Sequence, residues 1–339
     1  MNERIVSIVV PCRNEAAHID AFVSSALAQQ LAAGDELEVV IADGESSDGT
    51  REKLAAWQQR EPRLRVIDNP QRITSAALNR AVAAARGEVV VRMDVHTEYA
   101  SDYVAQCLAA LRETGAACVG GAWRPVGQGW PQAAIARAFE SRFGSGGAAS
   151  RRVDYTGEVD TVYLGAWWRD ALLRLGGFDE ALVRNQDDEL ALRITRGGGR
   201  VWQSAAIKSW YTPRASFAAL FRQFYQYGYW KVPVIRKHRL PASPRHLVPF
   251  AFVATLAILA LGGVVWSPAR WALGGVVGLY AAAALANALA LTRSPRDGLG
   301  IAWAFACMHG GYGLGFGRGL LDFALLKRAP GDAATRLTR

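Results

Sequence analysis

Two long stretches without a charged residue set the strongest constraint on how this 339-residue chain can fold. Residues 247–266 and 271–291 contain no Asp, Glu, Lys or Arg. A helix of about twenty apolar residues spans a hydrocarbon core of about 30 Å. The two stretches therefore predict two C-terminal transmembrane helices. A buried helical hairpin of a soluble domain is the alternative interpretation.

A third apolar stretch, residues 299–326, contains His309, Arg318 and Asp322 among several glycines. It could form a transmembrane helix packed through small residues, a re-entrant element or an interfacial helix. The sequence leaves this segment open and predicts a membrane domain over residues 247–326.

Basic residues surround the apolar stretches and predict their orientation. A cluster in the linker 231–246 directly precedes the first stretch, and its members are Lys231, Arg236, Lys237, Arg239 and Arg245. The positive-inside rule places this cluster in the cytosol, and two spans return the chain there at Arg293 and Arg296. A third span would place the start of the basic tail, residues 327–339, outside. The net charge of +9 could suggest nucleic acid, but no aromatic-basic motif of that kind is present, so a membrane is the expected partner.

Before the basic cluster, short β-branched runs alternate four times with helical patterns. This alternation predicts βαβ units and a doubly wound α/β domain with a mostly parallel sheet. The first run is too short for a signal-peptide core, so we expect the domain to remain in the cytosol. The expected strands are 5–10, 37–41, 64–67 and 89–91, and the expected helices are 16–30, 50–59, 74–85 and 100–113.

Polar residues follow three of these strands. They lie in the segments 11–15, 43–50 and 92–96. Ligands of open α/β sheets bind beyond the carboxyl ends of the strands, so these segments should converge on one site. Asp94 and His96 would lie on the same side of an extended segment. Carboxylate and imidazole are ligand types for a divalent cation on a diphosphate, which predicts a metal site at these two residues.

These motifs together resemble family 2 glycosyltransferases of the GT-A fold, in particular the membrane-bound succinoglycan-biosynthesis type. The resemblance covers about residues 6–230, and residues 1–230 are the expected cytosolic catalytic domain. It implies inverting transfer of one hexose from a UDP-sugar to a lipid-linked saccharide, with Mn²⁺ or Mg²⁺ as cofactor. It also implies bacterial exopolysaccharide or related glycan assembly at the inner membrane, with partner proteins of that pathway.

The resemblance assigns roles to the polar segments. Asp43 would bind the base, Arg72 would help to hold phosphate, and Asp94 with His96 would bind the metal in place of an acidic pair. Imidazole in the second position suits Mn²⁺ better than Mg²⁺. The remaining residues of the nucleotide pocket would be Pro11, Arg13, Asn14 and Glu15.

The family's acidic base motif matches residues 186–189, with Gln186 in the first acidic position. The general base maps to Asp187, and Asp188 could share the role. The residues expected near the donor sugar and the acceptor are Gly165, Ala166, Trp167, Gln226, Tyr229 and Trp230. Tyr229 replaces the arginine of the processive signature, which favours addition of a single sugar.

Two other functions remain open from the sequence. A polyprenyl-phosphate sugar synthase would use a lipid phosphate as acceptor, which is already ionised and would not need a general base. A non-catalytic membrane scaffold of the same fold is a further alternative, but the presence of Asp43, Asp94 and Asp187 together argues against it.

Overall fold

The computed structural model describes residues 4–241 and 243–331, and the chain forms two compact units. The first unit holds the chain up to Arg124 together with residues 152–211, and the second holds residues 125–151 and the chain from Thr212 onward. The domain boundary predicted at residue 230 falls inside a helix of the second unit, α9 (Phe217–His238), and it stays a prediction.

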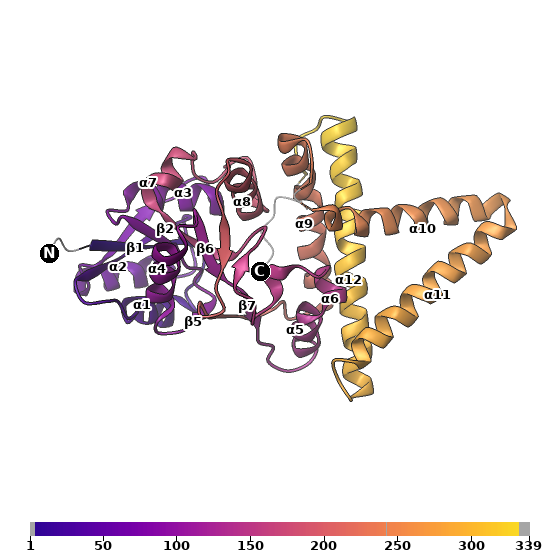
Figure 1. Cartoon of the computed structure of the whole chain (residues 1–339), viewed down its shortest axis with the longest axis horizontal. Helices are drawn as coiled ribbons and strands as arrows, with labels where there is room; N and C mark the ends of the chain where they lie inside the picture. Colours follow the sequence, from indigo (N-terminus) through magenta and orange to yellow (C-terminus); the bar gives the residue numbers. More distant parts are fainter. Residues whose placement is uncertain (1–3, 242, 332–339) are drawn as a thin grey trace. The chain divides into compact units, whose positions relative to one another are not determined.

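The first unit is built on an eight-stranded sheet with the order β3-β2-β1-β4-β9-β6-β10-β8. Strands β1, β2 and β6 of this sheet are labelled in Figure 1. The first four strands in the sheet order are parallel, and their order reverses between β1 and β4. A shorter sheet has the order β5-β11-β7. The strands are β1 (Arg4–Cys12), β2 (Asp35–Asp43), β3 (Leu64–Asp68), β4 (Val89–Arg92), β5 (Thr97–Tyr99), β6 (Cys118–Gly121), β7 (Trp123–Pro125), β8 (Gly157–Glu158), β9 (Tyr163–Trp168), β10 (Val201–Gln203) and β11 (Ser209–Tyr211).

All four predicted strands and all four predicted helices are present, which confirms the α/β fold. Alternate residues of β1, such as Ile8 and Val10, belong to the same core cluster as the buried faces of α1 and α4. Helix α3 covers the sheet through small buried residues, including Ala77 and Ala81. The helices of this unit are α1 (Ile19–Leu27), α2 (Thr50–Arg60), α3 (Thr74–Ala84), α4 (Tyr103–Thr114), α7 (Arg169–Arg174) and α8 (Gln186–Arg196).

Strand β9 was not predicted, and it changes the sheet. It pairs antiparallel with β4, with Val91 opposite Ala166, and antiparallel with β6. The beginning of β9 therefore lies at the edge where β4 ends. There the Tyr163 hydroxyl lies 2.9 Å from Oγ1 of Thr97. The start of β9, far along the chain from β4, thus lies beside the carboxyl ends of the first four strands.

The second unit centres on two helices that run in the same direction, α9 and α12 (Pro295–Gly319). Glycines of α12 allow their backbones to approach closely. A Cβ on Gly311, Gly315 or Gly319 would lie 2.0 to 2.7 Å from a backbone oxygen of α9. At the end of the pair, buried Tyr229 of α9 donates a hydrogen bond to Asp322, which also accepts one from Arg318.

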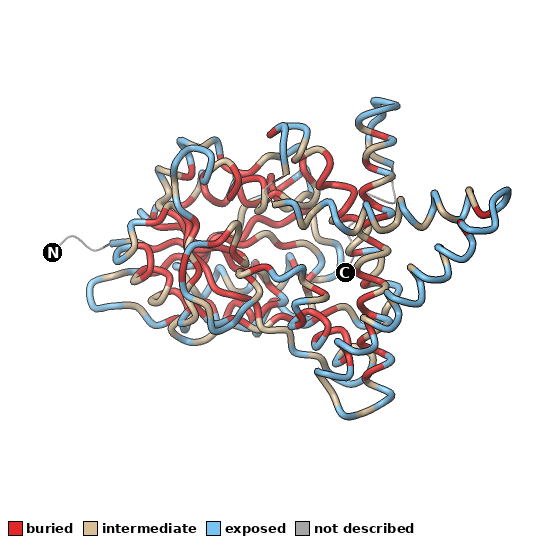
Figure 2. Tube along the Cα trace, turned by 45° about the vertical axis from the view of Figure 1, so that its right-hand side comes forward, coloured by how far each residue is buried: buried red, intermediate tan, exposed pale blue. Residues whose placement is uncertain are grey.

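The predicted apolar stretches form α10 (Val248–Val265) and α11 (Ser267–Leu289). They are long and apolar enough to cross a membrane, with mean hydropathy of 2.4 for Pro244–Val265 and 1.7 for Ser267–Leu289. Figure 2 shows that the α10–α11 hairpin is exposed over most of its length, unlike the core helix of a soluble protein. The third segment forms α12 and a π-helical continuation, Leu320–Leu325. The unit also contains α5 (Gln132–Glu140) and α6 (Arg142–Ser145).

The α9–α12 contact generates a prediction about stability. In Gly315→Ala the new methyl group would lie 2.0 Å from the carbonyl oxygen of Tyr225, and overpacking of this kind costs about 1–3 kcal/mol. Gly274→Ala in α11 is the matched control, because nothing lies within 4 Å of the new Cβ and alanine favours helix by up to about 1 kcal/mol. Thermal unfolding in detergent should show a lower Tm for the first variant only. Equal Tm values for the two variants would contradict the close packing.

Candidate active site

The carboxyl ends of the first three strands lie in register. Cys12 pairs with Asp43, and Asp43 pairs with Asp68. Strand β4 stops earlier, with Arg92 opposite Val9. The loops after β1 and β4 therefore flank the point where the strand order reverses. An open sheet of this type binds ligands at such a point.

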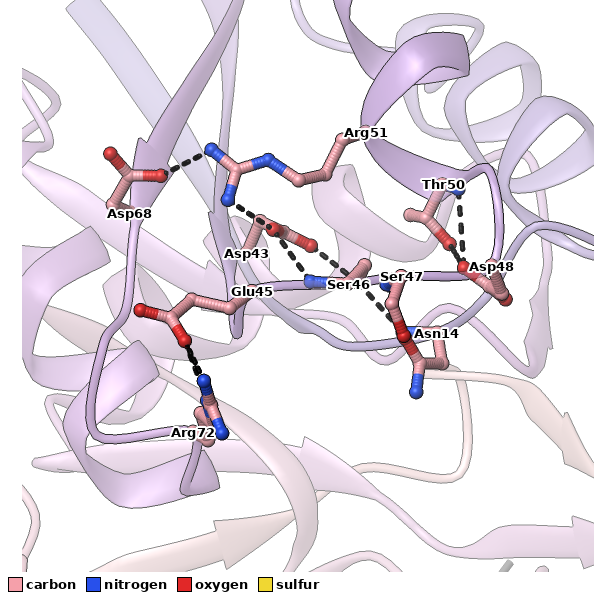
Figure 3. A network of polar contacts seen from close by, with 10 residues as sticks. All are labelled: Asn14, Asp43, Glu45, Ser46, Ser47, Asp48, Thr50, Arg51, Asp68 and Arg72. Atoms are coloured by element: carbon pink, nitrogen blue, oxygen red, sulfur yellow. Dashed lines mark hydrogen bonds and ion pairs between the residues drawn. The ribbon is translucent and has the colours of Figure 1, made fainter.

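Asp43 is the last residue of β2 and is buried at the carboxyl ends of the strands. Its hydrogen bonds fix the loop that follows β2 (Figure 3). Its carboxylate accepts hydrogen bonds from the Ser46 amide at 3.1 Å and the Ser46 hydroxyl at 2.5 Å. The Ser46 hydroxyl in turn accepts a bond from the Asn14 amide at 2.7 Å. Arg51 lies 3.6 Å from Asp43 and forms a 2.8 Å ion pair with Asp68. Residues from the first two predicted segments thus form one connected network.

Asp48 belongs to the same loop and supports its structure. Its carboxylate accepts hydrogen bonds from the Thr50 amide and hydroxyl and from the Ala16 amide. The N-cap residue of α2 is Gly49, which has a left-handed conformation. Asp48 is the residue before this cap, and it accepts two of its hydrogen bonds from Thr50, the first residue of the helix. Its pKa is lowered by these hydrogen bonds, although burial opposes the shift. Asp48 therefore ties the loop after β1 to the start of α2.

Two arginines lie beside this network. Arg72 donates a 2.7 Å hydrogen bond from Nε to Glu45 and forms an ion pair with it. The side chain of Arg13 lies over Gly44, where a Cβ would come within 3.2 Å of it. Nε of Arg13 is buried and has no hydrogen-bond partner within residues 4–241 and 243–331. An unsatisfied buried donor of this kind suits an anionic or carbonyl acceptor on a ligand.

Arg92 joins the predicted metal ligand to the predicted base. It is buried at the end of β4, and its Nε and Nη2 donate to the two carboxylate oxygens of Asp94 at 3.1 and 3.2 Å. Its Nη1 donates to Asp187 at 2.5 Å. Asp187 lies in the first turn of α8. One guanidinium therefore holds both acidic groups in a fixed geometry.

The charges at this cluster are unequal, because one cation faces two carboxylates. Burial raises the pKa of Asp187 to about 6, Arg92 opposes this shift, and Asp94 and Asp188 add to it. The pKa of Arg92 is raised by both aspartates, against the effect of its burial. A carboxylate with a pKa near the working pH is suited to general base catalysis.

Asp94 and His96 are the predicted metal ligands, so the groups around them decide whether a divalent cation could be held there. The imidazole Nδ1 of His96 lies 3.7 Å from the carboxylate of buried Glu15, which places a second acidic group beside it. Clusters of three or more His, Cys, Asp or Glu side chains arranged to hold an ion do not occur within the described residues. Ions of this class complete their coordination with substrate phosphate oxygens and water, so a carboxylate, an imidazole and a diphosphate form a chemically suitable set.

Strained backbone is concentrated in the same loops. Among the described residues of the first unit, five non-glycine residues adopt positive φ angles between 53° and 66°, and each lies in a predicted motif or within two residues of one: Asn14, Glu45, Arg72, Leu164 and Asn185. A conformation of this type costs about 1–3 kcal/mol and persists where surrounding contacts enforce it. Such residues gather at binding and catalytic sites, which supports the location of the site.

The other predicted residues lie on three elements, β9, α8 and α9. Gly165, Ala166 and Trp167 lie in β9, and Trp167 lines a small cavity together with Asp187. Asp188 lies in the first turn of α8 next to Asp187. The last three belong to α9 in the second unit, where all are buried: Gln226, Tyr229 and Trp230. The roles assigned to all these residues stay predictions.

Arg92 lies in the predicted segment 92–96, but the sequence analysis assigned it no role, and it missed Tyr99. The Tyr99 hydroxyl accepts a hydrogen bond from the Asp94 amide at 2.6 Å and donates one to the Asp94 carbonyl at 3.1 Å. For Arg92 a signal was present. It lies two residues before Asp94, so an extended chain places both side chains on the same side. For Tyr99 no spacing rule would have indicated the contact.

Comparison with known proteins shows the family of this chain. The glycosyl transferase family 2 model matches residues 7–173. The succinoglycan biosynthesis protein ExoA of Rhizobium meliloti (strain 1021) is 37% identical over 93% of this chain and 95% of its own length. The chain belongs to glycosyltransferase family 2.

Two further matches are more distant, one in sequence and one in structure. This family 2 glycosyltransferase is 23% identical, over 93% of its length and 97% of the relative, to a dolichyl N-acetyl-α-D-glucosaminyl phosphate 3-β-D-2,3-diacetamido-2,3-dideoxy-β-D-glucuronosyltransferase of Methanococcus voltae. The mannosyltransferase PcManGT of Pyrobaculum calidifontis, solved with GDP-Man and Mn²⁺, matches with a TM-score of 0.63. That match has 23% identity and covers 95% of this chain and 88% of the other. The GT-A fold is therefore shown.

The shared guanidinium generates a prediction about stability and pH. Arg92→Met leaves Asp94 and Asp187 without their common cation and should cost about 2 kcal/mol near neutral pH. The folded pKa of Asp187 is raised to about 6, so its charge destabilises the fold, and this cost decreases as pH falls below the folded pKa until it is gone below the unfolded pKa. Removing Arg92 raises that pKa further, so the deficit should shrink in mild acid.

Thermal melts near neutral and at mildly acidic pH would measure this difference. Arg92→Lys is the control, because it retains a positive charge without the forked geometry. A deficit of the same size at both pH values would contradict the electrostatic account.

Proposed function

We propose that this chain is an inverting, metal-dependent hexosyltransferase that moves one hexose from a UDP-sugar to a lipid-linked saccharide. The observation that carries the proposal is that Arg92 binds two carboxylates at once. One is Asp94, which would face the diphosphate of the donor, and the other is Asp187, which would act as the base. The similarity to ExoA, whose name describes succinoglycan biosynthesis, supports a role in bacterial exopolysaccharide or related glycan assembly.

The nucleotide would occupy the loops after β1 and β2. Pro11, Arg13, Asn14 and Glu15 would line the pocket, and Asp43 would accept a hydrogen bond from the base. The unsatisfied Nε of Arg13 would find an acceptor there. For Arg72 to hold phosphate, it would have to exchange its ion pair with Glu45 for the ligand. UDP is the proposed nucleotide, and GDP is the competitor to test.

The reaction needs one proton transfer and one displacement. The acceptor oxygen would form a bond to the anomeric carbon as the bond from that carbon to the diphosphate breaks, which inverts the anomeric configuration. Asp187 would take the proton of the acceptor hydroxyl, while Arg92 keeps its carboxylate oriented. Asp94 and His96 would hold Mn²⁺ or Mg²⁺, and this ion would supply positive charge to the leaving diphosphate.

The membrane helices suggest where the reaction takes place. The exposed apolar surface of α10 and α11 would be covered by lipid, and the basic residues before α10 would lie on the cytosolic side of the bacterial inner membrane. A catalytic unit attached to such a hairpin would meet a lipid-linked acceptor at the membrane surface. The Methanococcus relative, whose name describes transfer to a sugar on dolichyl phosphate, supports an acceptor of this class.

Asp94→Asn and Asp187→Asn should each lower transfer by about 10²–10⁴-fold, because each removes a charge that the reaction uses. A panel of UDP- and GDP-sugars with membrane lipid extract, scored by nucleotide release from purified protein, measures this. Asp170→Asn on the exposed side of α7 is the matched control and should retain activity. Full activity of Asp94→Asn would overturn the site.

The same panel separates the two acceptor classes. A polyprenyl phosphate is already ionised and needs no base. If Asp187→Asn remains active while Asp94→Asn is inactive, the result would therefore favour a polyprenyl-phosphate sugar synthase over the proposed function.

A further inference from the structure

The α10–α11 hairpin meets α12 at two separate points. A Cβ on Gly313 would lie 2.4 Å from the carbonyl oxygen of Pro249, at the start of α10. A Cβ on Gly298 would lie 2.9 Å from the side chain of Leu289, at the end of α11. Fifteen residues of α12 separate these points, which corresponds to about 22 Å along a helix axis. Helix α12 therefore runs across the base of the hairpin, as Figure 1 shows, and not alongside its two helices.

A stripe of exposed apolar residues runs along α12 and its π-helical continuation. Its members are Leu299, Trp303, Leu314, Leu321 and Leu325, and we refer to them as the α12 stripe. Successive members are separated by 4, 11, 7 and 4 residues, spacings that place them on one helical face. The glycines that pack on α9 occupy a different face. Apolar residues exposed along one face of a helix are a pattern of helices that lie in a membrane interface.

Basic residues lie at both ends of this helix. Arg293 and Arg296 lie at its beginning, and Lys327 and Arg328 follow its end. A transmembrane helix would place one pair on each side of the bilayer, against the positive-inside rule. A helix in the plane of the membrane would place both pairs on the same side. There each basic residue gains about 1 kcal/mol from anionic lipid.

We infer that α12 is an interfacial helix whose stripe is buried at the boundary between headgroups and acyl chains, on the side where both basic pairs lie. The inference rests on the proposed membrane insertion of the hairpin. A lipid partner is favoured because the stripe begins at Leu299, next to the point where lipid-exposed α11 reaches Gly298. The stripe is thus continuous with a surface that already requires lipid.

This position has a consequence for α9. Because α9 packs along α12 in the same direction, it also runs parallel to the membrane surface. The segment Gln226–Trp230 is then held at a constant depth by the contact between Tyr229 and Asp322. That depth is close to the headgroups, where the phosphate groups of a lipid-linked acceptor would lie.

The depth of single spin labels tests the inference. The full chain is placed in vesicles of phosphatidylethanolamine and phosphatidylglycerol, with one label at a time introduced through Leu299→Cys, Trp303→Cys, Leu314→Cys or Leu325→Cys. The four native cysteines are buried. Labels at Ile258→Cys and Leu261→Cys in α10, both exposed, serve as the comparison. Collision with oxygen and with a water-soluble nickel chelate reports the depth of each label.

The inference predicts the same shallow depth for all four α12 labels and acyl-chain depths for both α10 labels. Depth that changes along α12 by about 1.5 Å per residue would show a transmembrane helix and overturn it. Contact of the α12 labels with water alone, while the α10 labels remain in lipid, would also overturn it. If the α10 labels lie in water as well, the proposed membrane insertion itself fails. Because four positions are labelled, one misfolded variant leaves the profile readable.

Discussion

The guanidinium of Arg92 is the contact on which the site depends, because it fixes two acidic groups that would otherwise repel each other. Asp94 follows β4, whereas Asp187 comes from α8, more than ninety residues later. Burial raises the pKa of Asp187, the charges of Asp94 and Asp188 add to this shift, and the single cation of Arg92 opposes it without cancelling it. The same interaction therefore sets the geometry of the site and leaves it with a carboxylate suited to accept a proton.

The loops around this contact carry backbone strain that the rest of the first unit must support. Glu45 and Arg72 both adopt positive φ angles and are joined to each other by an ion pair. Asn14, in the same conformation, is bonded to the loop after β2 through Ser46 and Ser47. The parallel register of β1, β2 and β3 brings these loops together. A rigid sheet thus maintains loops that are individually unfavourable.

Local sequence patterns were sufficient for the regular part of this fold and not for its long-range contacts. Strands β1 to β4 are β-branched runs with helical patterns between them, and all were predicted. Strand β9 was missed because its residues pair with β4 and β6 across long sequence separations, and no local period marks them. The position of α12 could not be predicted either, because its glycines are explained only by their close contact with the backbone of α9. Asp43, Asp94 and Asp187 were named from motifs, but the arginine that joins two of them needed the structure.

The central claim is that the proposed metal ligand Asp94 and the proposed base Asp187 have separate roles, although Arg92 binds both. Electron paramagnetic resonance of Mn²⁺, titrated into the protein with UDP present, tests it directly. The account predicts that Asp94→Asn and His96→Ala lose Mn²⁺ affinity by roughly 10-fold or more, whereas Asp187→Asn binds Mn²⁺ as the unmodified chain does. Equal loss of affinity in Asp187→Asn, or unchanged affinity in Asp94→Asn, would contradict the division of roles.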